Sequence, residues 1–342
     1  MDRPATLRDV ADRADVHPST ASRALNERTR DLLNPVTARR VLVAADELGY
    51  QANPIARGLK TSRTMTIGMV VPDLTNPLFP PIVRGLEDRL GPAGFTLLIA
   101  NTDLDPQRET AVVEALRARR IDGLVAATSR SDNGLLAELA AAGLPLVLVN
   151  RAGDPSGASS VTPDDHAGIG QAVTHLVELG HTRIAHLAGS PRTSTGGDRL
   201  AAFRHWTAHH GLAVDDDLVA TAEAFTEADG AAACQALMER GTAFTAIVAA
   251  NDLVALGCYE VLREHGLRVP EDVSVVGYND ISFTHAFCPP LTSVRVPLYD
   301  LGRRAADLLL EAIDDDAAPT ASVRLTPSLV VRRSTSPHRQ DG

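Results

Sequence analysis

Residues 67–127 contain, in order, Ile67–Val71 (IGMVV), Ile82–Leu90 (IVRGLEDRL), Thr96–Ala100 (TLLIA), Glu109–Arg119 (ETAVVEALRAR) and Gly123–Ala127 (GLVAA). Short aliphatic segments therefore alternate with longer segments whose apolar residues recur at helical spacing. The short segments are apolar at nearly every position, which is typical of parallel strands that are buried on both faces. This alternation predicts an α/β fold with a doubly wound parallel sheet.

The same alternation continues to about residue 335, with more strands than one small sheet needs. Further segments are Leu146–Asn150, Ile184–Ala188, Ala246–Ala250 and Val273–Tyr278 for strands, and Gly168–Leu179, Leu200–His210, Gly230–Arg240 and Leu253–Gly266 for helices. We therefore expect two α/β lobes. The expected division is an N-lobe of about 64–162 plus 292–325, a C-lobe of about 163–291 plus 326–335, and a disordered tail at 336–342.

Residues 6–50 show no strand pattern and are expected to form three short helices. Thr6 is a side-chain N-cap for the first helix, and Asn34-Pro35 begins the third, which Gly49 ends. Three small helices with a tight turn between the first two describe a helix-turn-helix domain. Helical spacing alone is equally compatible with a small helical cap on the α/β body.

The charge differs between these two parts of the chain. The net charge is −10, from 33 basic and 43 acidic residues, and taken whole it argues against a nucleic-acid-binding protein. Residues 1–63 carry 11 basic and 8 acidic residues, a net of +3, which leaves −13 for the remainder. The basic surplus thus lies on the segment 1–63, which we expect to be the DNA-binding domain with its hinge helix.

If the second helix enters the major groove, its first residues meet base edges. These are Pro18 and Ser19, with Arg23 one turn further on. Arg23 is suited to a bidentate pair with guanine, worth about 1–3 kcal/mol of discrimination. The side chains suited to phosphate contacts, which position the protein without reading the sequence, are Thr6, Thr20, Ser22, Asn26 and Tyr50.

The segment 51–60 is a candidate hinge helix, with its own cap at Asn53 and a proline at position 54. A helix of two turns is too short to be stable alone in water. Its formation therefore requires partners, such as a second protomer and DNA, which favours DNA binding over a small helical cap.

Motifs in a consistent order span residue 5 to about residue 335. They are Thr6-Leu-Arg-Asp-Val-Ala11, Ser19-Thr-Ala-Ser-Arg-Ala-Leu-Asn26, Leu48-Gly-Tyr50, Ala56-Arg-Gly-Leu59, Thr66-Ile-Gly68, Val71-Pro-Asp73, Asn76-Pro77, Asp122-Gly-Leu124, Leu179-Gly-His181, Asp272-Val-Ser-Val-Val-Gly-Tyr-Asn-Asp280 and Pro290-Leu-Thr292. Together they resemble the LacI/GalR family of transcriptional regulators.

The resemblance implies a periplasmic-binding-protein-like body and a homodimer on a near-palindromic operator, released or tightened by a small effector. It also implies that Leu59 is an apolar wedge in the minor groove, beside Arg57 and Lys60. The sequence departs from the family at His17, where Ser usually caps the recognition helix, and at Asp15, where Gly or Asn is common. We expect a weaker cap at His17, whereas Asp tolerates the left-handed backbone.

Polar side chains follow the predicted strands, where ligands of open α/β sheets bind. These side chains are Asp73, Asn76, Asn101, Asp103, Asn150, Arg151, Asn251, Asp252, Asn279 and Asp280. A hydroxyl-rich ligand needs amides, an arginine fork and an aromatic face, for which Arg199, Phe79 and Phe225 are candidates. The expected effector site, which the family resemblance supports for most members, comprises Asn76, Phe79, Asn150, Arg151, Arg199, Phe225, Asn251 and Asn279.

Several members of these sets also have a purely structural interpretation. Asp252 and Asp280 are candidate caps of the helices that follow them, and Phe225 is a candidate core residue. Arg199 is able to pair with an acid such as Asp198. At Asn279 the family often has a carboxylate, so the hydroxyl pattern of the effector does not transfer.

No cofactor or metal is expected. His205 and His209 have a metal-compatible i,i+4 spacing, but no suitably spaced Glu or Cys accompanies them, so a solvated helix face is favoured. The three cysteines form no close pair, and neither a signal peptide nor a membrane-spanning run is visible, which predicts a cytoplasmic protein.

The sequence thus predicts a repressor, not an enzyme, whose operator affinity is controlled by a sugar or sugar derivative. The alternatives are a sugar-binding protein with the same two lobes and a carbohydrate-active enzyme. For the enzyme, Asp252 with Asp280 is the candidate acid–base pair facing the cleft.

Overall fold

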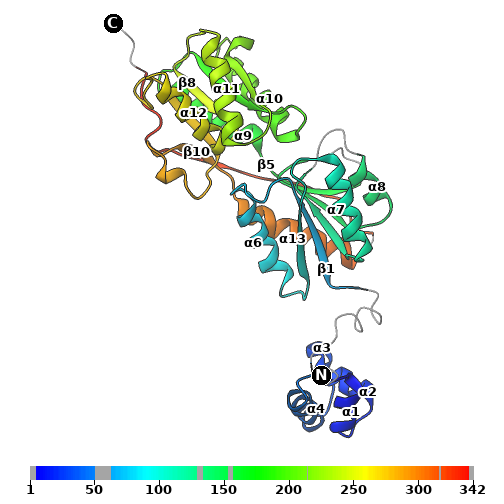
Figure 1. Ribbon diagram of the computed structural model, residues 1–342. Helices are drawn as coiled ribbons and strands as arrows, with labels where there is room; N and C mark the ends of the chain where they lie inside the picture. Colours follow the sequence, from blue (N-terminus) through cyan, green and yellow to red (C-terminus); the bar gives the residue numbers. More distant parts are fainter. Residues whose placement is uncertain are drawn as a thin grey trace. The chain divides into compact units, whose positions relative to one another are not determined.

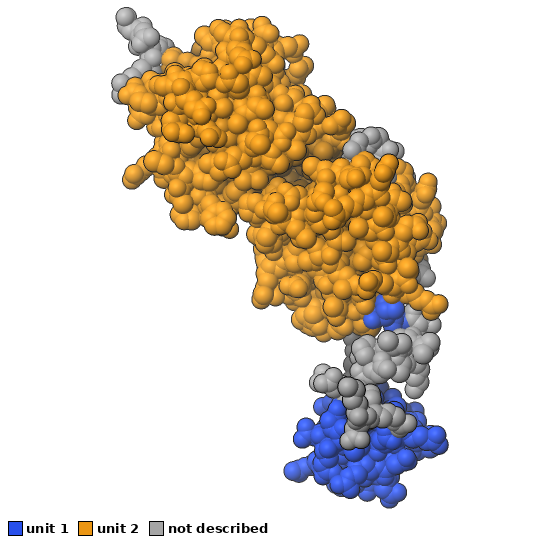
Figure 2. Space-filling model, in the orientation of Figure 1, with its two compact units in different colours: residues 1–64 blue, residues 65–342 orange. Residues whose placement is uncertain are grey.

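The computed structural model describes residues 5–50, 63–128, 134–152, 157–213, 215–315 and 317–338. The chain divides into two compact units, residues 1–64 and 65–342 (Figure 2). This division falls within one residue of the boundary expected from charge and pattern. The candidate hinge helix at 51–60 lies outside the described residues.

The first unit contains the three predicted helices and one further turn. Its helices are α1 (Leu7–Arg13), α2 (Pro18–Leu25), α3 (Glu27–Arg30) and α4 (Pro35–Glu47). The expected caps form, because Thr6 accepts a hydrogen bond from the backbone of Asp9 and Asn34 from that of Val36. After α4, Gly49 takes a φ of +56°, in the left-handed region that glycine adopts without strain.

Small side chains form the core of this unit. Of the nine buried residues in its described part, five come from α1, α2 or the turn after α1, and most of the nine are alanine, which lets the helices approach closely. The buried set is Val10, Ala11, Ala14, Ala21, Ala24, Ala38, Val41, Ala44 and Ala45. The added turn α3 closes the end of α2, since Thr29 Oγ1 donates to the carbonyl of Arg23 at 2.9 Å.

The first lobe of the second unit is built on a parallel sheet of order β11-β5-β4-β3-β1-β2 (Figure 1). Its strands are β1 (Thr66–Val71), β2 (Thr96–Asn101), β3 (Gly123–Ala126), β4 (Leu146–Val149), β5 (Ser159–Pro163) and β11 (Ser322–Leu325). Its helices are α6 (Phe79–Leu90), α7 (Pro106–Ala118), α8 (Leu135–Ala141) and α13 (Leu298–Asp314). Helices α6 and α13 pack together, and a Cβ on Gly302 would lie 2.0 Å from the carbonyl oxygen of Ile82.

The second lobe has a matching sheet of order β12-β10-β9-β8-β6-β7, in which only the β10–β12 pair is antiparallel among the described strands. Its strands are β6 (Ile184–Gly189), β7 (Val219–Ala222), β8 (Ala246–Ala249), β9 (Ser274–Asn279), β10 (Thr292–Arg295) and β12 (Ser328–Val330). Its helices are α9 (Asp165–Glu178), α10 (Ser194–His209), α11 (Glu227–Glu239) and α12 (Asp252–Glu264), with 3-10 turns at Asp216–Leu218 and Thr284–Ala286. Two doubly wound sheets therefore form the body, as the alternation predicts.

Strand pairing corrects the expected lobe boundaries at one point. The sequence places the segment 292–325 in the N-lobe, but β10 pairs with β9 in the C-lobe sheet, with Val294 beside Tyr278. The apolar and hydroxyl side chains of β10 are buried there, so the chain returns to the N-lobe only at α13.

The tail is also shorter than expected. The sequence predicts disorder from residue 336, yet Ser336 donates from its backbone to Ser274 Oγ at 3.1 Å. The backbone N–H of His338 donates to the carbonyl of Leu179 at 2.8 Å. These hydrogen bonds hold the segment on the C-lobe, and residues 339–342 lie outside the described residues.

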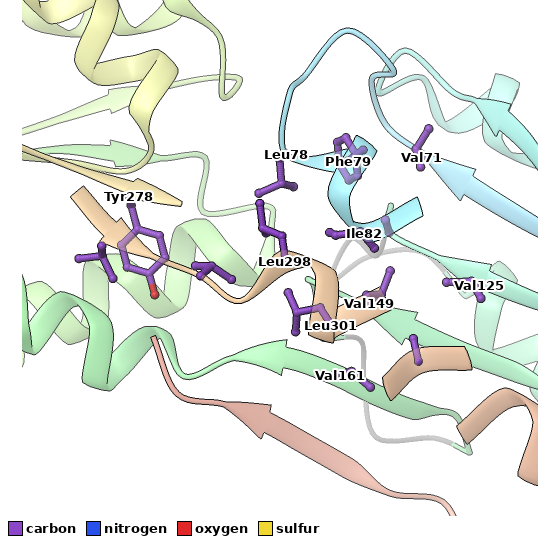
Figure 3. Packing of buried hydrophobic residues seen from close by; sticks show 14 of the residues in the cluster. Val71, Leu78, Phe79, Ile82, Val125, Val149, Val161, Tyr278, Leu298 and Leu301 are labelled. Carbon is purple, nitrogen blue, oxygen red and sulfur yellow. The ribbon is translucent and has the colours of Figure 1, made fainter. Parts of the chain in front are cut away.

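A continuous apolar core joins the two lobes. Figure 3 shows Tyr278 of the second lobe and Leu298 of the first in the same cluster of buried side chains, with Leu78 directly above Leu298 in this view and Phe79 to the right of Leu78. Among the described helices, none has the length and apolar character that crossing a membrane requires.

Candidate functional site

Helix α2 presents a polar face to solvent. Ala21 and Ala24 are buried, whereas Ser19 and Arg23 are exposed and Pro18, at the start of the helix, is half-buried. Small apolar side chains thus hold α2 in the first unit, while the residues expected to meet base edges remain accessible.

The recognition helix is capped in spite of its unusual residue. His17 Nδ1 accepts a hydrogen bond from the backbone N–H of Ser19 at 3.2 Å and lies 2.8 Å from Ser19 Oγ. An imidazole nitrogen therefore replaces the usual hydroxyl oxygen. In the preceding turn Asp15 has a φ of +51°, which agrees with the tolerance expected of Asp.

The candidate phosphate contacts differ in availability. The hydroxyl of Thr6 already donates to Asp9 Oδ2 at 2.6 Å within the α1 cap. Tyr50 is half-buried against the head core, and burial raises the pKa of its phenol. Thr20, Ser22 and Asn26 keep part of their surface accessible, whereas Arg57, Leu59 and Lys60 lie outside the described residues.

A cavity opens at the carboxyl ends of strands from both sheets. It has about 510 Å³ of empty volume, its solvent-open part included. All eight residues predicted for the effector site line it, together with Pro72, Asp73, Leu78, Leu104, Thr195 and Thr226. The sequence pattern therefore brings together a set of side chains from widely separated segments, although it does not indicate Leu78, Leu104 or Thr226. Thr195 was expected in a loop near the ligand and lies instead in the first turn of α10.

Two amides of the cavity have clear structural partners. Asn76 Oδ1 accepts from the backbone of Leu78 at 3.0 Å, just before α6. Asn251 Oδ1 caps α12 by accepting from Val254 N at 2.8 Å, and its Nδ2 donates to the carbonyl of Phe225 at 3.1 Å. Helix capping and positioning of the Phe225 loop thus account for these amides.

Asn150 and Asn279 are different. Both are almost fully buried, and the side-chain oxygen of each has no hydrogen-bond partner among the described residues. Both have positive φ, +65° for Asn150 and +103° for Asn279, a backbone region that residues other than glycine adopt rarely. Asn150 lies in the left-handed well that Asn tolerates, whereas Asn279 lies outside it, and backbone strain of that kind is found at ligand sites.

Arg199 is fixed by the protein itself. Its Nε donates to Asp165 Oδ1 at 2.9 Å and its Nη1 to the carbonyl of Ala250 at 2.7 Å. Its guanidinium also stacks over the ring of Tyr278, 3.9 Å from the centroid. The acid that pairs with Arg199 is therefore Asp165, and not the adjacent Asp198 that the sequence suggested.

Arg151 has no such compensation. It is 6% exposed, and its Nε and Nη1 have no hydrogen-bond partner in the described part of the chain. Its pKa is lowered to about 10, chiefly by burial and also by the charge of Arg199, while Glu109 acts in the opposite direction. Its Cζ lies 5.9 Å from the centroid of the Phe225 ring.

The two aromatic rings are placed by close packing. Phe79 is buried at the start of α6, and Phe225 is half-buried after β7. A Cβ on Gly189 would lie 2.4 Å from Phe225 Cζ, so a side chain at this strand end would displace the ring. Sequence reasoning missed Gly189, whose only signal was a glycine at the end of a predicted strand.

The remaining polar residues after the strands lie elsewhere. Asn101, Asp103, Asp252 and Asp280 do not line the cavity. Asp252 is fully buried and accepts from Ser293 Oγ at 2.5 Å, while Asp280 pairs with Arg295 and Arg332, each at 2.7 Å. The carboxylates expected to face the cleft in an enzyme are thus occupied inside the C-lobe.

His205 and His209 are exposed on α10, as expected for a solvated face. Within the described ranges, no three His, Cys, Asp or Glu side chains are arranged to hold a metal ion.

Comparison with known proteins identifies the family. Residues 6–53 match the family described as bacterial regulatory proteins, lacI family, and residues 173–335 match the periplasmic binding protein-like domain. Over 338 residues the chain is 33% identical to the HTH-type transcriptional repressor PurR of Photobacterium profundum, covering 96% of this chain and 98% of that protein. The chain belongs to the lacI family of bacterial regulatory proteins.

Solved lacI-family structures have the same architecture. The complex of the transcriptional regulator CelR with cellobiose is 34% identical with a TM-score of 0.74, covering 96% of this chain and 99% of that one. The lac repressor dimer bound to operator and the anti-inducer ONPF is 27% identical with a TM-score of 0.84, covering 98% and 100%. As a lacI-family member, the chain is a DNA-binding transcriptional repressor with a two-lobed ligand-binding body.

Proposed function

We propose that the cavity binds a sugar or sugar derivative and that this ligand controls operator affinity. In this proposal the repressor acts as a cytoplasmic homodimer without enzymatic activity. Its effector contacts are the eight cavity residues predicted above, and α2 reads the operator through Pro18, Ser19 and Arg23.

The unpartnered oxygens of Asn150 and Asn279 carry this proposal. A buried acceptor that lacks a donor costs about 1–3 kcal/mol, so two such oxygens in one cavity favour a ligand that supplies O–H or N–H groups. A hydroxyl-rich molecule supplies several such donors at close spacing.

The rest of the lining suits the same kind of ligand. Phe79 and Phe225 offer apolar surfaces against which the C–H faces of a sugar ring can pack. The lac repressor structure was solved as a dimer on its operator, and a dimer presents two recognition helices to two half-sites. Light scattering on the purified protein tests the proposed dimer, and a monomer bound to operator would contradict it.

Thermal shift against a carbohydrate panel tests the effector site directly, because a ligand that binds only the folded protein raises Tm by mass action. The variants Asn150→Gly and Asn279→Gly remove the amide while tolerating the left-handed backbone. We expect ligand-induced shifts to shrink in both. The matched control is Asp103→Gly, which removes a polar side chain at another residue of positive φ, outside the cavity.

Operator binding separates the proposal from its alternatives. A sugar-binding protein or carbohydrate-active enzyme with the same body would bind the ligand without any change in DNA affinity. A repressor controlled by the ligand must show coupling between the two, equal in both directions.

A further inference from the structure

We propose that the effector is anionic, a carbohydrate bearing a carboxylate or phosphate group, and that Arg151 binds this group. The inference rests on the proposed function of the cavity and adds the chemical class of its ligand. Carboxylates and phosphates share the acceptor geometry that a guanidinium fork recognises, and the experiment below distinguishes them.

The charges that line the cavity support an anion. Its ionisable residues are Asp73, Arg151 and Arg199. Asp165 compensates Arg199 within a buried pair, and Asp73 accepts hydrogen bonds within its own turn from Thr75, at 2.8 Å and 2.7 Å. Arg151 alone of the three forms no ion pair or hydrogen bond with the described residues.

The burial of Arg151 makes an unpaired state unfavourable. Its Nε and Nη1 have been removed from water without gaining an acceptor among the described residues, and its pKa is lowered chiefly for that reason. The charged groups that act on it are Arg199, which repels it, and Glu109, which attracts it. Glu109 accepts a hydrogen bond from Thr128 Oγ1 and does not line the cavity, so the cavity side of Arg151 is left for a ligand.

Helix ends add a second, independent contribution. Residues at the N-termini of α6, α10, α11 and α12 line the cavity, namely Phe79, Thr195, Thr226 and Asn251. The N-terminus of a helix carries about half a positive elementary charge, and those of α10, α11 and α12 border this space, whereas Pro80 and Pro81 remove N–H groups from the first turn of α6. The electrostatic environment therefore favours negative charge in the ligand.

The two amide oxygens restrict the ligand further. Asn150 and Asn279 need donors, which an inorganic anion does not provide in sufficient number at neutral pH. A ligand that satisfies both amides and Arg151 carries hydroxyl groups at one end and an anionic group at the other. Sugar acids and sugar phosphates have this combination.

The test uses the full chain and a panel in which each aldose is present as the neutral sugar, its aldonate, its uronate and its phosphate ester. Binding is measured by thermal shift and calorimetry. We expect one anionic member to bind at least about tenfold more tightly than its neutral parent, because one charge-assisted hydrogen bond accounts for a gain in affinity of that size. The carboxylate and phosphate arms of the panel identify the source of the charge.

The variants separate recognition from packing. Arg151→Gln should abolish the preference for the anion over the neutral parent, and Arg151→Lys should retain part of it. Arg192→Gln is the control, since that arginine is exposed and outside the cavity. Arg151→Gln should also unfold at a higher temperature than wild type without ligand, because it removes an uncompensated buried charge.

Several results would overturn the inference. One is a neutral sugar that binds as tightly as all its anionic derivatives, and another is an Arg151→Gln protein that keeps the anion preference. Both leave the proposed function intact, because a ligand still occupies the cavity and still depends on Asn279. Failure of every neutral and anionic member to bind would overturn both proposals.

Discussion

Arg199 and Asp165 form a buried ion pair, with 2.9 Å between Nε and Oδ1, that joins α10 to α9 at the wall of the cavity. The two side chains are only 3% and 8% exposed. A pair of this kind contributes little net stability over apolar residues, but removing one partner leaves the other charged and buried. Arg199 therefore depends on Asp165 for its placement beside the ligand space.

Asp165→Asn should destabilise the second unit by about 3–5 kcal/mol, because the charge of Arg199 then has no counter-ion. Urea unfolding measures this, followed by the fluorescence of Trp206, the single tryptophan, which lies in that unit. Arg192→Gln, which breaks an exposed pair with Glu223, should cost at most about 1 kcal/mol. Equal midpoints for Asp165→Asn and wild type would show that the pair is not buried in solution.

Two buried groups of the C-lobe give the protein opposing pH dependences. Burial raises the pKa of Asp252 to about 7, so the folded state holds a proton that the unfolded state releases above about pH 4. Its contribution to stability is present at low pH and is lost as pH rises to about 7. Burial lowers the pKa of His186 to about 4, so its contribution is lost as pH falls from 6.5 towards 4.

Because the two contributions have opposite slopes, together they should leave the free energy of unfolding of wild type nearly constant between about pH 4 and 6.5. Relative to Asp252→Asn, the free energy of unfolding of wild type should fall by about 1.4 kcal/mol for each unit that pH rises between 4 and 7. Relative to His186→Gln, it should fall by about 1.4 kcal/mol for each unit that pH drops below 6.5. Urea unfolding at several pH values measures both differences. Parallel pH profiles for wild type and either variant would refute the buried state of the mutated group.

The cap of the recognition helix depends on the imidazole of His17. His17→Ala should weaken the first turn of α2 by about 0.5–2 kcal/mol, whereas His17→Ser should retain the cap. Amide hydrogen exchange of the first unit, measured in the full chain, reports the stability of this turn. We expect faster exchange at Ser19 in the alanine variant. Unchanged exchange in His17→Ala would mean that the hydrogen bond to Ser19 contributes nothing.

Arg23 is expected to set sequence preference. Arg23→Ala should lose about 1–3 kcal/mol of discrimination at one base pair and so relax the preferred site. Arg57→Ala is the comparison, since loss of a positive charge beside the expected minor-groove residue Leu59 should weaken all sites similarly. Selection from a random DNA library measures both, and identical specificity profiles for Arg23→Ala and wild type would remove Arg23 from base recognition.

The sequence predicted the framework of the fold well, because buried parallel strands and amphipathic helices have clear periodicities. Some predicted helices begin too late: Ile82–Leu90 is in fact Phe79–Leu90, because the first turn contains prolines that carry no apolar pattern. The strand β10 was missed for a related reason. Its sequence, Thr292–Arg295, holds two hydroxyl residues, one valine and one arginine and has no apolar pattern, and only its pairing with β9 shows to which lobe it belongs.

For the site, the sequence indicated which residues lie at the strand ends, but not what each one does there. Asn251 and Asn279 look equivalent in the sequence, yet one caps α12 and the other has a buried oxygen without a partner among the described residues. Asp252 and Asp280 also follow strands, but their side chains turn into the C-lobe. Such differences depend on side-chain direction and burial, which spacing along the chain does not encode.

Operator affinity measured by fluorescence anisotropy, with and without the ligand found by thermal shift, shows whether the cavity controls DNA binding. The operator would be the site selected from a random library. We predict that the ligand changes the Kd of wild type at least about fivefold, the lower end of ordinary allosteric coupling, and leaves that of Asn279→Gly nearly unchanged. An operator Kd that is the same with and without saturating ligand in wild type would mean that the cavity ligand does not control this repressor.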